Sequence, residues 1–230
     1  MDKILEEIFE KSDPAYKAFQ EKLVPTIEQS SVLGLRAPLA LAIAKKYAHT
    51  DLGEAFLCTL PHKFYDENIV HAFMLGLRCD SAEKSKAEII RFLPFVDNWA
   101  VCDGLCSHLK TFFKDRDKHY DFVLECARSQ SAYTCRFGLV CLLNYYIDQA
   151  HIDDILKICK SIQSEEYYVK MAVAWLLSFC LIKEYDDTIP LIESKALSTW
   201  VHNKSIQKAR ESRQLSHAKK DFLKSLKVKE

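Results

Sequence analysis

The sequence predicts an all-α fold, and three observations lead to that prediction. Apolar residues recur at intervals of three and four along most of the 230 residues, and no segment alternates convincingly as a strand does. Only five glycines and six prolines occur, which suits helices joined by short polar turns better than a β-sandwich or a glycine-looped nucleotide fold. Trp99, Arg136 and Trp175 follow one another at intervals of 37 and 39 residues, each within a helical segment.

That spacing predicts a repeat. Two-helix repeats of the HEAT kind have periods of about 40 to 47 residues, and equivalent positions in successive repeats of a solenoid line the same face. We therefore expect a curved HEAT-like α-solenoid with Trp99, Asp103, Arg136 and Trp175 along its concave surface. Aromatic, cationic and anionic groups on one surface suit a nucleic-acid substrate better than they suit a core.

The expected helices begin with ILEEIF at residues 4–9, whose apolar residues form a stripe that ends at Asp13-Pro14. A second helix is expected from Tyr16 to about Gln29, and after the turn SVLGLRAP a third opens at Pro38. Later helices are expected near 51–60, 66–78, 82–92, 97–112, 117–129, 132–147, 151–161, 165–183, 186–196 and 203–226, the last continuous or broken. Four of these helices have natural N-cap residues, at Asp51, Asp66, Ser81 and Asp97.

The formal net charge of zero hides an asymmetry. Residues 201–230 carry nine Lys and Arg against three acidic residues, a net of +6, so the other 200 residues carry −6. This basic C-terminal helical segment either places a cationic patch beside a groove or simply keeps a terminal helix soluble. Because no linker or low-complexity tract precedes it, we expect one HEAT-like-repeat domain over residues 1–230.

Nine cysteines, an odd number, lie mostly inside apolar helical runs, as buried small hydrophobic residues do. The chain starts with an acidic helix rather than an apolar leader. Both features predict free thiols and a reducing, cytoplasmic location. No apolar segment approaches the roughly 20 residues that span a bilayer, so no membrane partner is expected.

Two groups of potential metal ligands occur, Cys102 with Cys106 and His108, and His62 with Asp66, Glu67 and His71. The first lacks the second ligand pair of a zinc site, and the second lacks the HExxH spacing of a metalloprotease. No phosphate-binding loop, dinucleotide fingerprint or GxSxG motif is present. We therefore expect no metal site.

Two helical segments carry residues capable of chemistry. FVDNWAVCDGL places Trp99 and Asp103 four residues apart on one helix face. Because Asp103 has apolar neighbours in this segment, its carboxylate must have a partner, face a cleft or have a raised pKa. Arg136 interrupts the apolar run of SAYTCRFGLV, so it either pairs with a carboxylate or faces a cleft where an anion binds. Lys170 and Trp175 lie in the strongly apolar YYVKMAVAWLLSF. Each tryptophan alone also fits a plain core position.

The segments LGLRAPLALAIAKKY, DNWAVCD, YTCRFGLV, YYVKMAVAWLLSF and NKSIQKARES resemble the DNA alkylation repair proteins of the AlkD type, the HEAT-like-repeat alkylpurine DNA glycosylases. The resemblance runs over roughly residues 14–225. It implies a C-shaped solenoid that clasps duplex DNA, acts as a monomer and needs no metal or organic cofactor. It implies that Asp103 is the catalytic carboxylate and that Trp99, Arg136, Lys170 and Trp175 bind the DNA around the lesion.

The stretch before LGLRAP departs from the family pattern. It offers Tyr16 and Phe19, and it has Pro25 and polar residues where an aromatic side chain is expected. The resemblance is thus to a divergent branch with a reduced N-terminal lesion-recognition region.

The function implied is hydrolysis of the N-glycosidic bond of cationic 3- or 7-alkylpurines in duplex DNA. Cleavage develops oxocarbenium character on the sugar, which Asp103 stabilises while it orients or deprotonates water. Trp99 and Trp175 contact the sugar-phosphate and Arg136 holds a flanking phosphate. Two alternatives stay open: a DNA-binding relative with little or no glycosylase activity, and a protein-interaction solenoid.

Overall fold

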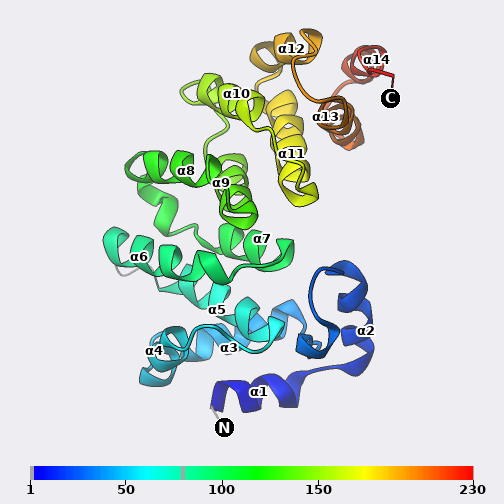
Figure 1. Ribbon diagram of the computed structural model, residues 1–230. Coiled ribbons are helices and arrows are strands. Elements are labelled where there is room, and N and C mark those ends of the chain that lie inside the picture. The colour runs from blue at the N-terminus through cyan, green and yellow to red at the C-terminus, as the bar shows by residue number, and fades with distance from the viewer. Residues whose placement is uncertain (1–2, 79–80, 230) are drawn as a thin grey trace. The chain divides into compact units, whose positions relative to one another are not determined.

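The computed structural model describes residues 3–78 and 81–229 (Figure 1). The contacts within the chain divide it into two compact units. The N-terminal unit is Met1–Asp115 and the C-terminal unit is Arg116–Glu230. The described residues contain fourteen α-helices and no strand, which confirms the all-α prediction. The HEAT-like solenoid and the single domain over 1–230 stay predictions.

The N-terminal unit contains the first seven α-helices. They are α1 Lys3–Lys11, α2 Pro14–Leu23, α3 Ala37–Tyr47, α4 Asp51–Cys58, α5 Tyr65–Leu77, α6 Ala82–Phe92 and α7 Trp99–His108. Short 3₁₀ segments also occur in the described part of the chain, at Gln29–Ser31, Leu93–Phe95 and Phe112–His119. Within this unit α5 packs against both α3 and α7, and almost all of its residues are buried. The helix that carries the predicted catalytic carboxylate, α7, therefore stands on the most buried element of its unit.

The C-terminal unit contains the other seven. They are α8 Tyr120–Ala127, α9 Ala132–Tyr145, α10 Ile152–Ser161, α11 Tyr167–Lys183, α12 Tyr185–Glu193, α13 Thr199–Glu211 and α14 His217–Ser225. Here α11 packs against α9 on one side and α13 on the other, while α8 packs on α9 and α10 on α12. The segment expected at 203–226 is thus two helices. Ser216 begins the second one, because its hydroxyl accepts a hydrogen bond from the Lys219 amide at 3.3 Å.

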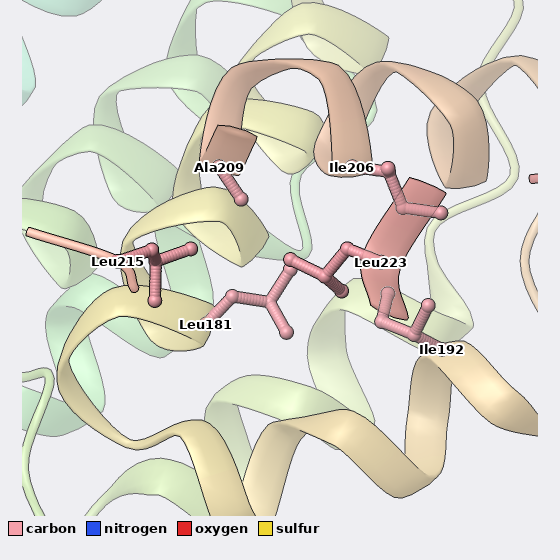
Figure 2. Packing of buried hydrophobic residues seen from close by; sticks show 6 residues of the cluster. All are labelled: Leu181, Ile192, Ile206, Ala209, Leu215 and Leu223. Carbon is pink, nitrogen blue, oxygen red and sulfur yellow. The ribbon is translucent and has the colours of Figure 1, made fainter. Parts of the chain in front are cut away.

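The basic C-terminal segment is folded onto its unit by a buried apolar cluster (Figure 2). The cluster joins α11, α12, α13 and α14, together with the connection before α14, through Leu181, Ile192, Ile206, Ala209, Leu215 and Leu223. Burying an aliphatic side chain of this size stabilises by about 1.5–3 kcal/mol. Six of the nine lysines and arginines of residues 201–230 are therefore carried on packed helices, three on α13 and three on α14.

Two of the four expected N-caps are displaced by one residue. Thr50, not Asp51, caps α4 by accepting from the Gly53 amide at 3.1 Å. Asn98, not Asp97, caps α7 by accepting from the Val101 amide at 2.9 Å. In both cases a neutral side chain is the N-cap. Asp51 then lies in the first turn of α4, and Asp97 lies before α7. Ser81 caps α6 as predicted.

Asp66 is also not an N-cap, and the reason is tertiary. Its carboxylate is buried and accepts hydrogen bonds from the backbone amides of Leu33 and Leu35, at 2.6 and 2.7 Å. It therefore holds the LGLRAP turn onto α5. The first turn of α5 is capped instead by Glu67, whose carboxylate accepts from the Phe64 amide at 2.8 Å.

α5 and α7 approach each other closely at Gly76. A Cβ at that position would lie 2.5 Å from the Cβ of His108 and 2.6 Å from its carbonyl oxygen. Only glycine allows the helices to pack at this distance, so Gly76 sets the position of the carboxyl end of α7.

Seven of the described cysteines are buried, as their apolar surroundings predict: Cys102, Cys106, Cys126, Cys135, Cys141, Cys159 and Cys180. Burial raises the pKa of the Cys180 thiol to about 12, so this thiol stays protonated at neutral pH. Cys58 is exposed, and Cys79 lies outside the described residues. Among the helices of residues 3–78 and 81–229, none has both the length and the apolar composition of a membrane span.

Candidate nucleic-acid site

The carboxylate predicted to be catalytic lies on α7. Val101, Cys102 and Leu105 face the core and are fully buried, whereas Trp99 and Asp103 are half-buried. Trp99 and Asp103 are four residues apart, so they share one face of this helix, as the sequence predicts. The Asn98 cap fixes where the helix begins and therefore where this face points.

Trp99 is held in place from the N-terminal helices. Its indole N–H donates to the carbonyl of Leu23, the last residue of α2, at 2.9 Å. Because a helix leaves its last carbonyls without intrahelical partners, Leu23 offers a ready acceptor. The same ring lines a cavity of about 250 Å³ together with Tyr16, Tyr65 and Phe73. Trp99 is thus a partly exposed, hydrogen-bonded wall residue and not a plain core aromatic.

The region before LGLRAP contributes to that cavity. Tyr16, Gln20 and Leu23 of α2 all line it. Gln20 is buried and its amide donates to the Leu35 carbonyl at 3.4 Å. Phe19, the other aromatic residue expected here, is half exposed, with its ring 5.9 Å from that of Tyr16.

His108 lies at the carboxyl end of α7 and lines the same cavity. Its Nδ1 is 2.8 Å from the Gly104 carbonyl, and its ring packs on Phe73 at 4.1 Å between centroids. A carbonyl oxygen only accepts, so Nδ1 carries a hydrogen. The sequence drew attention to His108 only as a weak zinc ligand, and its place in the cavity was not predicted.

In the C-terminal unit, Arg136 on α9 is buried, with 4% of its surface exposed. One guanidinium nitrogen donates to the carbonyl of Tyr168 at 2.8 Å. This hydrogen bond ties α9 to the amino end of α11. Trp175, further along α11, is half-buried, and its ring meets that of Phe179 edge-on at 6.2 Å.

Lys170 lies one turn into α11 and has two partners. Its ammonium is 3.0 Å from the exposed carboxylate of Glu165 and 5.7 Å from the ring centroid of Trp200 on α13. Trp200, the third tryptophan of the chain, was not among the predicted site residues. A signal for it exists in the sequence, because Lys204 follows Trp200 by four residues, the spacing of helix neighbours.

The five predicted site residues are divided between the units. Trp99 and Asp103 belong to the N-terminal unit, and Arg136, Lys170 and Trp175 belong to the C-terminal unit. Their convergence on one concave face stays a prediction. Among the residues that the structure describes, no group of three or more His, Cys, Asp or Glu side chains is placed to hold a metal ion.

Comparison with known families gives a match over most of the chain. The model of a family described as DNA alkylation repair enzyme matches residues 4–212. This range runs from α1 to the end of α13 and contains all five predicted site residues. Comparison with curated proteins and with solved structures gave no match.

Proposed function

Since the chain belongs to the DNA alkylation repair enzyme family, we propose that it is an alkylpurine DNA glycosylase. It binds duplex DNA and hydrolyses the N-glycosidic bond of cationic 3- or 7-alkylpurines, without a metal or an organic cofactor. The observation that carries the proposal is the pair Trp99 and Asp103, four residues apart on one face of α7 and inside the matched region.

The reaction needs little from the protein beyond electrostatics. An alkyl group at N3 or N7 makes the purine cationic, so the C1′–N bond breaks with both electrons leaving on the base, which becomes neutral. The positive charge moves to the sugar as an oxocarbenium ion. Water then adds its oxygen to C1′ and gives up one proton. The group required is an anion close to C1′ that stabilises the developing charge and receives or directs that proton.

Asp103 is the proposed anion. It lies on a helix that is fixed at one end by the Asn98 cap and at the other by the Gly76–His108 contact. A carboxylate held by a rigid helix loses little free energy to reorganisation as charge develops, which is the source of most electrostatic catalysis. Its half-buried position provides a lower local dielectric than bulk water and leaves an approach open.

Trp99 is the proposed sugar contact beside Asp103. The hydrogen bond from its indole to Leu23 holds the ring in one orientation. The π face of a tryptophan attracts positive charge, by about 0.5–1 kcal/mol at exposed sites and more when desolvated. Trp175 and Lys170 are the proposed DNA contacts of the C-terminal unit, and Lys170 holds a phosphate, which positions the duplex without reading its sequence. Arg136 is buried and bonded to the Tyr168 carbonyl, so its proposed part is to position the amino end of α11, which carries Lys170.

The test is single-turnover release of base from duplex DNA that contains 7-methylguanine or 3-methyladenine. We expect release by the wild type, and none above background by Asp103→Asn, which keeps the shape and removes the charge. Asp51→Asn is the matched control, because Asp51 is an exposed acid at the first turn of α4. It should release base at the wild-type rate.

Retained release by a folded Asp103→Asn variant would sink the assignment of Asp103. Duplex binding without release by the wild type would favour the DNA-binding relative. Neither release nor salt-dependent duplex binding would leave the protein-interaction solenoid as the better description.

A further inference from the structure

A row of aromatic side chains crosses the C-terminal unit and is not used by the proposed reaction. Tyr133 begins the row on α9, Tyr168 and Tyr167 continue it on α11, and Trp200 ends it on α13. Successive ring centroids are 6.2, 5.2 and 5.8 Å apart. All four residues lie within the first two positions of their helices. We call these four residues the Trp200 row; the three helices that carry them are adjacent in Figure 1.

Lysines accompany the row. The ammonium groups of Lys170 and Lys204 lie 5.7 and 5.6 Å from the ring centroid of Trp200. Lys204 also donates to the Gln207 side chain at 2.9 Å, and Lys170 pairs with Glu165, whose carboxylate is fully exposed. Two cations at one ring repel each other, and a surface pair such as Lys170–Glu165 is weak enough for an incoming anion to replace.

A groove of about 380 Å³ continues from Trp200. Trp200, Lys204 and Lys227 line it. Its far wall is the segment after α14, which is held to α13 by a reciprocal pair: the Asn203 amide donates to the Val228 carbonyl at 2.8 Å, and the Val228 amide donates to the Asn203 side chain at 3.0 Å. These two hydrogen bonds hold the segment after α14 against α13, and this segment places Lys227 in the groove beside Trp200.

We propose that the Trp200 row and its groove bind an unpaired strand of DNA next to the duplex. This inference rests on the proposed function for the identity of the nucleic acid. Aromatic rings that stack on bases, with lysines along them for the phosphates, are how proteins hold single strands without reading sequence. In a duplex the base faces are already stacked and only their edges are accessible, so the row has nothing to stack on.

The exposure of the row agrees with this role. Tyr167 is 52% exposed, and the other three rings are only half-buried. The positive amino ends of α9, α11 and α13 add to the charge of the lysines. Residues 201–230 carry the net charge of +6, and Lys204 and Lys227 bring part of it to the groove.

The experiment compares three labelled probes by anisotropy: a blunt duplex, the same duplex with a single-stranded thymidine extension, and the extension alone. Wild-type protein should bind the extended duplex more tightly than the blunt one. Tyr167→Leu and Trp200→Leu should each weaken binding of the extension by about fivefold to a hundredfold, the range that one lost stacking contact gives. Trp200→Phe, which keeps an aromatic ring, should restore most of the loss.

The salt dependence of binding distinguishes the contribution of the lysines from that of stacking. Lys204→Gln should lower the slope of log affinity against log salt by about 0.7 for the extension, whereas Trp200→Leu should leave that slope unchanged. Phe222→Leu and Lys224→Gln are the matched controls, an exposed aromatic residue and an exposed lysine of α14, and should bind as the wild type does. Circular dichroism tests whether each variant is folded. If Trp200→Leu does not fold, Tyr167→Leu is the variant that decides the test.

Equal binding of blunt and extended duplexes, or an extension preference that survives folded Tyr167→Leu, would overturn the inference. The proposed function fails separately. A preference for the extension with no base release by the wild type would reject the glycosylase activity and keep the strand site.

Discussion

Asp66 offers the sharpest test of how the N-terminal unit is held together. Its carboxylate is 1% exposed and accepts two hydrogen bonds, at 2.6 Å from the Leu33 amide and 2.7 Å from the Leu35 amide. Asp66→Asn keeps the size and shape of the side chain. It leaves one oxygen to accept one amide and turns an NH₂ group toward the other amide. The variant therefore loses one charge-assisted bond and leaves two donors facing each other inside the protein.

The magnitude follows from two destabilising terms and one that opposes them. A hydrogen bond to a charged group contributes about 1.5–3 kcal/mol, and an unsatisfied buried donor costs about 1–3 kcal/mol. Against these, burial already disfavours the charged form: desolvation raises the pKa of Asp66 by more than the backbone hydrogen bonds lower it. Removing the charge recovers part of that penalty. We expect a net loss of about 2–4 kcal/mol of unfolding free energy, or roughly 4–16 °C in Tm for a chain of this length.

Urea unfolding measures the loss of unfolding free energy, and amide hydrogen exchange shows which segment of the chain is destabilised. Exchange in Asp66→Asn should rise first in the peptide that contains Leu33 and Leu35, while peptides from α9 and α11 keep their protection. Asp51→Asn, an exposed acid on the neighbouring helix α4, should change stability by only a few tenths of a kcal/mol. A loss below about 0.5 kcal/mol for Asp66→Asn, or uniform exchange across both units, would refute the argument.

Two further predictions concern helix α5 and its neighbours. His71 is fully buried with its ring stacked on Phe92 at 4.0 Å, and burial lowers its pKa well below 6.5. The unfolded chain therefore takes up a proton that the folded chain refuses, and stability should fall below pH about 6.5 by up to about 1.4 kcal/mol per pH unit from this group. Urea midpoints between about pH 7 and 5 should show a shallower fall for His71→Phe, and equal slopes would contradict the assignment. Gly76→Ala places a methyl group 2.5 Å from the Cβ of His108, so it should cost about 1–3 kcal/mol in a thermal melt; an unchanged Tm would mean that α7 shifts freely.

The sequence predicts local features of this fold well because they depend on neighbouring residues. Apolar periodicity locates most of the helices, although α2 ends at Leu23 and not near Gln29 as expected. The spacing of Trp99 and Asp103 puts both on one face of α7. The errors lie where a side chain has a choice of partner. Asp66 has the sequence context of an N-cap, yet its carboxylate is taken by a turn more than thirty residues earlier in the chain. No local pattern distinguishes these two uses of an aspartate.

The features that the sequence missed depend on packing between helices. Trp200 comes thirty residues after Lys170, and only the contact of α11 with α13 brings the ammonium to the ring. Likewise His108 becomes part of a cavity because Gly76 lets α7 approach α5. A partial signal was present at the start of α11 and of α13, where Tyr167 precedes Lys170 by three residues and Trp200 precedes Lys204 by four.

The departure of the residues before LGLRAP from the family pattern stays a prediction, and the family model matches the chain from residue 4. One hydrogen bond ties α2 to the candidate site, from the Trp99 indole to the Leu23 carbonyl. Two more connect α2 to α5 through the LGLRAP turn, from Gln20 to the Leu35 carbonyl and from the Leu35 amide to Asp66. Because the backbone of α2 is hydrogen-bonded to a residue that lines the cavity, α2 is an ordered part of the cavity wall. Tyr16 and Gln20 line the cavity from this segment. If base release fails while duplex DNA still binds, the lining of this cavity is the first cause to test, by substitution at Tyr16 before any change to Asp103.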